Sequence, residues 1–253
     1  MDTAIHVVKF GSGLLTQGGS VKSDIKLHTE RLLKQYKRNG LIVVSSGAVA
    51  IGGRIARELG YGEDSLGAEQ LAGMGFAPVF SAWQEAFASH GVAVASTGIT
   101  HHQLGGGRWY HRLGNRSEKR VLMRILRENA EAGIVTVLNE SDMISNTELM
   151  RLATGGDNDG LAARVAIAMS AETLTIYSEH GGIFDANQRL VSTVDSRSVE
   201  RLRTMLADRA KSAAGKGGVL AKADAAWAAA CAGVNHVSIT DVNGKNITRF
   251  VIG

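Results

Sequence analysis

The chain has 253 residues, 44% of them hydrophobic and 21% charged, a composition typical of a globular α/β domain. Its net charge of +4 is not gathered into a long Lys/Arg block, which argues against a nucleic-acid surface. A single cysteine excludes an internal disulfide, and no run approaches the roughly 18 apolar residues of a membrane span. Since no basic leader precedes the first strand pattern, we expect a cytoplasmic protein without nucleic-acid or membrane partners.

Apolar, β-branched runs alternate with amphipathic stretches along the chain. The runs predict strands at 5–10, 41–44, 92–96, 134–138, 173–177, 234–239 and 247–252, the last one at an edge of the sheet. The amphipathic stretches predict helices at 23–38, 48–59, 71–89 with a kink at Pro78, 116–132, 160–170, 196–207 and 218–232. Strands that alternate with helices indicate one α/β domain, residues 1–253, with a mostly parallel sheet covered on both faces.

Polar, glycine-bearing turns follow several of these strands or precede the helices. The most informative stretch is Gly155-Gly156-Asp157-Asn158-Asp159, directly before an Ala/Leu-rich helix pattern. Asp and Asn are also the favoured helix caps, so a plain cap explains this stretch about as well when it is taken alone. Ligands of parallel sheets bind at the carboxyl ends of the strands, where most of these turns fall.

Lys9 lies inside an otherwise apolar strand pattern. One interpretation is an edge-strand lysine that reaches solvent. The other is a cation aimed at a phosphate, with backbone N–H groups of Gly11 and Gly13 approaching the same anion. The Walker pattern is absent, and a lone Gly-x-Gly is a weak signal.

Other turns carry similar ambiguity. Ser45-Ser46-Gly47 serves equally as a helix cap or as a contact for a small polar substrate, and Asn139 and Asp142 are adequate as turn residues. Lys216 and Lys222 flank a glycine pair at a helix start, where a bound anion would offset the unfavourable dipole. Cys231 is expected to pack as a small apolar residue. Lysines, glycine turns and carboxylates at one sheet edge are what phosphoryl transfer needs.

Five motifs together resemble the amino acid kinase superfamily, above all its branch that phosphorylates the γ-carboxylate of glutamate. They occur in the family's order and at about its spacing over nearly the whole chain: residues 7–12 (VVKFGS), 44–50 (VSSGAVA), 138–142 (LNESD), 156–159 (GDND) and 215–218 (GKGG) with Lys222. The resemblance implies a three-layer αβα sandwich, the amino acid kinase fold. It also implies a kinase domain alone, without the C-terminal PUA domain of many relatives.

The resemblance assigns roles to individual residues. Lys9 and Lys222 would contact the transferring phosphate, and Asp159 would organise both lysines. Substrate-binding positions would be Ser46, Gly47, Asp142 and Asn158. Nucleotide-binding positions would be Lys9, Gly11, Ser12, Ser178, Glu179, Lys216, Gly217, Gly218 and Lys222. No protein side chain is expected to bind a metal directly.

The implied reaction transfers the γ-phosphate of Mg-ATP to glutamate and yields glutamyl 5-phosphate, the first step of proline biosynthesis. ATP and Mg²⁺ would be the cofactors and a homodimer or homotetramer the assembly. Two alternatives remain: a kinase of the same fold with another carboxylate, phosphate or phosphonate acceptor, and a non-catalytic nucleotide- or oxyanion-binding protein. The chain departs from the family where Ser178-Glu179 replaces Thr-Asp and where Gly75-Phe76 replaces Gly-Gln.

Overall fold

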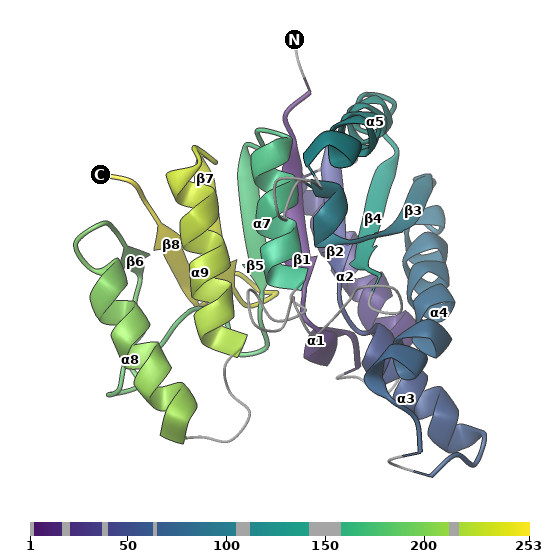
Figure 1. Cartoon of the computed structure of the whole chain (residues 1–253), viewed down its shortest axis with the longest axis horizontal. Helices are drawn as coiled ribbons and strands as arrows, with labels where there is room; N and C mark the ends of the chain where they lie inside the picture. The colour runs from purple at the N-terminus through teal and green to yellow at the C-terminus, as the bar shows by residue number, and fades with distance from the viewer. Residues whose placement is uncertain are drawn as a thin grey trace.

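The computed structural model describes residues 3–16, 21–36, 40–62, 65–104, 112–141, 158–212 and 218–253. Its centre is an eight-stranded sheet in the order β3-β4-β2-β1-β5-β7-β8-β6 (Figure 1). The strands are β1 (His6–Phe10), β2 (Leu41–Ser45), β3 (Val94–Ile99), β4 (Val135–Glu140), β5 (Thr173–Tyr177), β6 (Thr193–Val194), β7 (His236–Thr240) and β8 (Ile247–Phe250). All neighbours pair in parallel except β7 and β8.

The helices cover both faces of this sheet. They are α1 (Ser12–Thr16), α2 (Val21–Tyr36), α3 (Ala48–Glu58), α4 (Ala68–Ala88), α5 (Arg112–Glu131), α7 (Asn158–Ala168), α8 (Val199–Ser212) and α9 (Gly218–Cys231), with a 3₁₀ turn η1 (His101–Leu104). In Figure 1, α7 and α9 lie in front of the sheet and α2 lies behind it. The expected three-layer αβα sandwich with a mostly parallel sheet is confirmed.

The central strands β1, β2, β4 and β5 are buried on both faces, which explains why their sequences are mostly apolar runs. Val7 and Ile42 belong to a core shared with α5, α7 and α9, whereas Val8 and Val43 belong to a second core beneath α2, α3 and α4. Consecutive residues of one strand therefore serve opposite layers, as the two-residue period of a strand requires.

The register of β1, β2 and β5 aligns the carboxyl ends of these three strands at the same edge of the sheet. Phe10 is level with Ser45 of β2 on one side and with Tyr177 of β5 on the other. The turns after β1, β2 and β5 therefore leave the sheet together, at its lower edge in Figure 1. The chain moves from β1 to β2 on one side and returns to β5 on the other, so the β1/β5 boundary is the switch point where such sheets form a ligand crevice.

The backbones of helices α3 and α4 lie in direct contact at Gly52 and Gly75. A β-carbon on Gly52 would overlap the carbonyl of Leu71, and one on Gly75 would overlap the carbonyl of Ala48. α4 runs without interruption through Pro78, and its Trp83 donates a hydrogen bond from Nε1 to Ser45 Oγ at 2.9 Å. This packing holds α4 against the end of β2.

Three expectations need correction. β8 is not at an edge, because β6 pairs on its outer side through two residues, too short a strand to stand out in sequence. Sequence reasoning also missed α1 and η1, of five and four residues. Cys231 is exposed at the end of α9 instead of packed. Among the described residues, every helix is too short or too polar to cross a membrane.

Candidate functional site

Three charged side chains from distant parts of the sequence meet at the carboxyl edge of the sheet. Lys9 Nζ of β1 lies 2.6 Å from Asp159 Oδ1, and Lys222 Nζ of α9 lies 3.0 Å from Asp159 Oδ2. Asp159 stands in the first turn of α7, where a carboxylate also complements the helix dipole. One carboxylate thus holds two ammonium groups that are 213 positions apart in the sequence numbering.

The trio is largely removed from water. Lys9 and Asp159 are 4% and 2% exposed, and the Lys222 side chain is 19% exposed. Burial acts to raise the pKa of Asp159, but the two neighbouring ammonium groups outweigh it, so its pKa lies below the usual value. Asp159 is therefore ionised at neutral pH, and the three side chains together carry one net positive charge.

Lys9 is not an edge-strand lysine. β1 lies between β2 and β5 in the middle of the sheet, and the lysine is buried there. A buried ammonium group is costly unless it is paired, and Asp159 provides that partner. A bound anion is therefore not needed to explain the lysine, but the trio's net positive charge favours one.

The turn after β1 lies beside the ammonium group of Lys9. A β-carbon on Gly11 would be 3.9 Å from both Lys9 Nζ and the carbonyl oxygen of Tyr177. The short helix α1 begins at Ser12, which is exposed. Gly11 and Ser12, both predicted nucleotide contacts, thus lie next to the buried lysine.

The two serines after β2 differ in their surroundings. Ser45 is fully buried and accepts the hydrogen bond from Trp83. Ser46 is half-buried, and its backbone N–H donates to Phe10 O at 3.0 Å, which ties the β2 turn to the end of β1. Gly47 is the N-cap residue of α3 and has φ 103°, in the left-handed region, and a β-carbon there would lie 3.0 Å from Leu15 Cδ1. Ser46 is the serine that remains available to a ligand.

The end of β4 contributes buried polar groups. The backbone N–H of Glu140 donates to Asn158 Oδ1 at 3.1 Å, which ties the start of α7 to β4. Asn139 is 1% exposed, and its Oδ1 has no hydrogen-bond partner among the described residues. Sequence reasoning treated Asn139 as a turn residue, whereas it belongs to a strand. It directly precedes Glu140, whose backbone N–H ties β4 to Asn158.

The remaining candidates divide into placed and unplaced residues. Ser178 and Glu179 form the turn after β5, and Gly218 begins α9, where its carbonyl accepts a hydrogen bond from Lys222 Nζ at 3.2 Å. Asp142, Lys216 and Gly217 lie outside the described residues, as does Asp157. The structure brings Lys9, Asp159 and Lys222 together and places the Gly11, Ser46 and Ser178 turns at the same edge.

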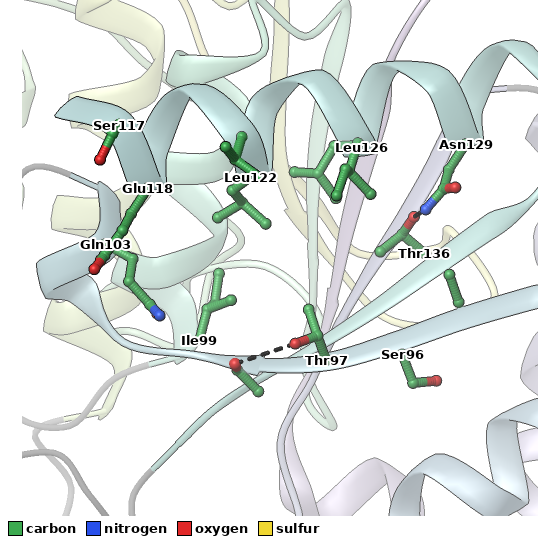
Figure 2. A pocket seen from close by; sticks show the side chains of 14 residues that line it. Ser96, Thr97, Ile99, Gln103, Ser117, Glu118, Leu122, Leu126, Asn129 and Thr136 are labelled. Atoms are coloured by element: carbon green, nitrogen blue, oxygen red, sulfur yellow. Dashed lines mark hydrogen bonds between the residues drawn. The ribbon is translucent and has the colours of Figure 1, made fainter. Parts of the chain in front are cut away.

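A separate hollow lies between α5 and the edge strand β3 (Figure 2). Its volume is about 490 Å³, and Ile99, Leu122 and Leu126 form an apolar lining, with Gln103 and Glu118 at one end. None of the described site candidates lines it. The hollow therefore does not belong to the cationic site.

Comparison with known proteins identifies the family to which this chain belongs. The family model for the amino acid kinase family matches residues 4–241, and the chain belongs to that family. The chain is 34% identical to the glutamate 5-kinase of Myxococcus xanthus, over 91% of this chain and 59% of that protein. It is 32% identical to the glutamate 5-kinase of Shewanella halifaxensis, over 97% of this chain and 64% of that protein.

The chain spans about three-fifths of the length of these curated relatives. Among solved structures, a carbamate kinase from Giardia superposes with a TM-score of 0.65 at 14% identity, with both chains fully covered. That likeness bears on the fold alone.

Proposed function

We propose that this protein is an ATP-dependent kinase that phosphorylates the γ-carboxylate of L-glutamate to give L-glutamyl 5-phosphate, the first step of proline biosynthesis. The observation that carries the proposal is the contact of Lys9 and Lys222 with one buried carboxylate. The kinship with glutamate 5-kinases at 32–34% identity supports the choice of acceptor.

The chemistry needs no general base, because the attacking carboxylate of glutamate is already ionised. One of its oxygens forms a bond to the γ-phosphorus of ATP while the bond from that phosphorus to the bridging oxygen breaks, and ADP leaves with the electron pair. Negative charge moves towards the leaving oxygen and spreads over the transferred group. Ammonium groups held in place before the reaction stabilise that charge without reorganisation.

Asp159 would act through the two lysines. By accepting contacts from both Lys9 and Lys222, its carboxylate fixes where their ammonium groups lie. The turns at Gly11 and Ser12 and at Ser178 and Glu179 would hold the nucleotide, together with Lys216, Gly217 and Gly218. Ser46, Gly47, Asp142 and Asn158 would hold glutamate.

Mg²⁺ would enter with ATP, held mainly by phosphate oxygens. Among the described residues, no group of three or more His, Cys, Asp or Glu side chains is arranged to hold a metal ion. Mg²⁺ commonly binds through substrate phosphates and water with few protein ligands. It would neutralise charge on the β- and γ-phosphates, and the lysines would supply the remaining positive charge.

The proposal is tested by trapping the acyl phosphate with hydroxylamine. Purified protein is incubated with Mg-ATP and glutamate, aspartate or N-acetylglutamate, and the hydroxamate and ADP are quantified. We expect hydroxamate with glutamate and little with the other two acceptors. ATP turnover with another acceptor but none with glutamate would show that this kinase phosphorylates a different substrate. Nucleotide binding without any turnover would favour a non-catalytic nucleotide-binding protein.

We also propose that the chain is one domain and forms a homo-oligomer in the cytoplasm. One continuous sheet joins both ends of the described chain, which supports a single domain. The face of α4 that carries Trp83 and Phe87 is core, so that face cannot serve as the subunit contact. Val121 and Ile125 of α5 are half-exposed beside the edge strand β3 and offer apolar surface for a second copy. Light scattering after gel filtration measures the subunit number.

A further inference from the structure

A cleft of about 490 Å³ opens on the face of the sheet that α2 covers, opposite the Lys9–Asp159–Lys222 trio. We call it the α2 cleft: α2 forms one wall, the turn at 242–244 forms the other, and strands β5 and β7 form the floor. Asp159 and Lys222 belong to α7 and α9, which lie in front of the sheet in Figure 1, whereas α2 lies behind it. The sheet itself therefore separates the α2 cleft from the proposed kinase site.

The floor of the α2 cleft is polar, although the faces of buried parallel strands are ordinarily apolar. On this face β5 and β7 carry four hydroxyl side chains, which the register pairs as Thr175 with Ser238 and Tyr177 with Thr240. On the opposite face the intervening residues of the same strands are apolar and belong to the core shared with α7 and α9: Leu174, Ile176, Val237 and Ile239. One side of these two strands is thus built for packing, and the other is built to hydrogen-bond.

Hydrogen bonds fix the floor against the α2 wall. Tyr36 OH lies 2.9 Å from Thr175 Oγ1, and Gln35 Nε2 donates to Tyr36 OH at 2.8 Å. Tyr177 OH in turn donates to Gln35 Oε1 at 3.3 Å. These bonds join α2 to β5, so the polar groups of the α2 cleft are in place before a ligand arrives, which lowers the entropic cost of binding.

The opposite wall is a turn that is held by its own backbone. Asp241 Oδ1 accepts a hydrogen bond from the N–H of Asn243 at 2.7 Å, and Asp241 Oδ2 accepts one from the N–H of Asn246 at 2.9 Å. The only carboxylate of this turn is therefore bonded within the turn, and the turn is a firm boundary of the α2 cleft.

The α2 wall supplies positive charge. Lys34 Nζ lies 2.7 Å from Glu30 Oε1, and the Lys34 side chain is 75% exposed, so water and a paired carboxylate already satisfy it. Arg31 is half-buried, and within the described part of the chain no carboxylate forms an ion pair with it. A guanidinium presents its N–H donors in a planar fork that matches a carboxylate or a phosphate. Arg31 is thus the cation that remains available to a ligand in the α2 cleft.

We propose that the α2 cleft is a second ligand site, which binds a small organic anion that carries a carboxylate or phosphate group together with a hydroxyl group. Arg31 would bind the oxyanion, and the hydroxyl groups of Ser238 and Thr240 would hydrogen-bond to the rest of the ligand. The volume of the α2 cleft, about 490 Å³, falls within the range of about 300–1,000 Å³ that small-molecule sites occupy. This inference does not depend on the kinase activity, because the sheet separates the two sites.

Calorimetry of the purified protein with malate, glycerol phosphate and inorganic phosphate tests the proposal. Malate and glycerol phosphate each carry a hydroxyl group, one beside carboxylates and the other beside a phosphate, so the two probes separate the two kinds of oxyanion. We expect at least one of them to bind with a dissociation constant of about 1 mM or lower, and more tightly than inorganic phosphate. Binding of neither probe, or binding no tighter than that of inorganic phosphate, would overturn the proposal.

Variants of the α2 cleft show where the probe binds. Arg31→Gln should weaken its binding at least about tenfold, because charge-assisted hydrogen bonds are lost, and Arg31→Lys should weaken it less. Ser238→Ala removes one floor hydroxyl and should weaken binding about three- to fivefold, a second measurement should Arg31→Gln fail to fold. Lys26→Gln is the matched control, since this exposed lysine of the same helix does not line the α2 cleft.

Lys222→Ala separates the α2 cleft from the proposed kinase site. This variant should bind the probe as tightly as the unmodified protein, because Lys222 lies on the other side of the sheet. Probe binding that is lost in Lys222→Ala and kept in Arg31→Gln would overturn the proposal and assign the anion to the trio.

Discussion

This protein contains two clusters of three charged side chains in which the signs of the charges are reversed. In the site, Asp159 lies between two cations, Lys9 and Lys222, and is 2% exposed. On the surface, Arg203 of α8 lies between two anions, at 2.7 Å from both Glu200 Oε1 and Asp224 Oδ1. The Arg203 side chain is 35% exposed, and its partners are more exposed still.

The two clusters differ in how strongly water and salt screen their charges. Water and salt screen the surface cluster, so its ion pairs contribute little, and it serves to join α8 to α9. The buried cluster has an excess positive charge in a region of low dielectric, where charges interact far more strongly. The surface cluster, with one cation and two anions, therefore acts as a tether between two helices, whereas we expect the buried cluster, with one anion and two cations, to favour a bound anion.

The largest expected effect is on stability, from Asp159→Asn. Removal of the carboxylate leaves two ammonium groups facing each other in a buried site, and breaking such a pair costs about 3–5 kcal/mol. Urea unfolding of the variant measures this loss. A change below about 1 kcal/mol would mean that the buried cluster behaves like the surface one.

Lys222→Ala should leave the fold intact and lower kcat about 10²- to 10³-fold, the effect of removing one preorganised charge from a transition state. Its side chain is partly exposed, so stability should suffer less than in Asp159→Asn. The hydroxamate assay at saturating substrates gives kcat. Arg203→Ala, which breaks the surface cluster, is the control and should turn over at the rate of the unmodified protein.

Gly75→Ala tests the helix packing beside the site. Its β-carbon would overlap the carbonyl of Ala48, directly after Gly47, so α3 and α4 must separate at a cost of about 1–3 kcal/mol. Thermal unfolding measures the loss. Gly53→Ala lies on the same helix pair with room for a methyl group and should be neutral or stabilising; equal losses in both variants would remove the close-packing explanation.

Acid should weaken the fold through His28. Burial lowers the pKa of His28 below its ordinary value of 6.5, so the unfolded chain binds more protons and stability falls as pH drops below about 6.5. The slope is limited to about 1.4 kcal/mol per pH unit for one group. His28→Gln should flatten the pH dependence of urea unfolding between pH 7 and 5.

The smallest effect belongs to the surface cluster. Arg203→Ala should change the free energy of unfolding by less than about 1 kcal/mol, and the change should shrink further in high salt. Urea unfolding at low and high ionic strength measures both. A loss as large as that of Asp159→Asn would show that exposure does not separate the two clusters.

Much of this arrangement could be predicted from sequence, because strand patterns place the ends of β1, β2 and β5 at one edge. Lys9 was open to two interpretations, since an apolar run does not reveal whether its strand is central or at an edge. The partnership of Lys9 with Lys222 came only from family resemblance. Short elements such as β6 and α1 lack a periodic signal.

Other contacts that depend on tertiary packing have no signal in the local sequence. Glu179 stood out as longer than the family's aspartate, but its carboxylate lies against Gly13, 166 positions earlier, a contact that local spacing does not indicate. Asparagine is a residue type common in turns, and only the register of β4 with β3 shows that Asn139 belongs to a buried strand. Side-chain partners across the sheet edge follow from three-dimensional packing, which local spacing does not encode.

The most direct measurement is a crystal structure of the protein with a non-hydrolysable ATP analogue, Mg²⁺ and glutamate. We expect the γ-phosphate within hydrogen-bond distance of both Lys9 Nζ and Lys222 Nζ, with Asp159 still between the two lysines. A triphosphate bound elsewhere would contradict this expectation; the α2 cleft, of about 490 Å³ and lined by Arg31 and Lys34, is one such place.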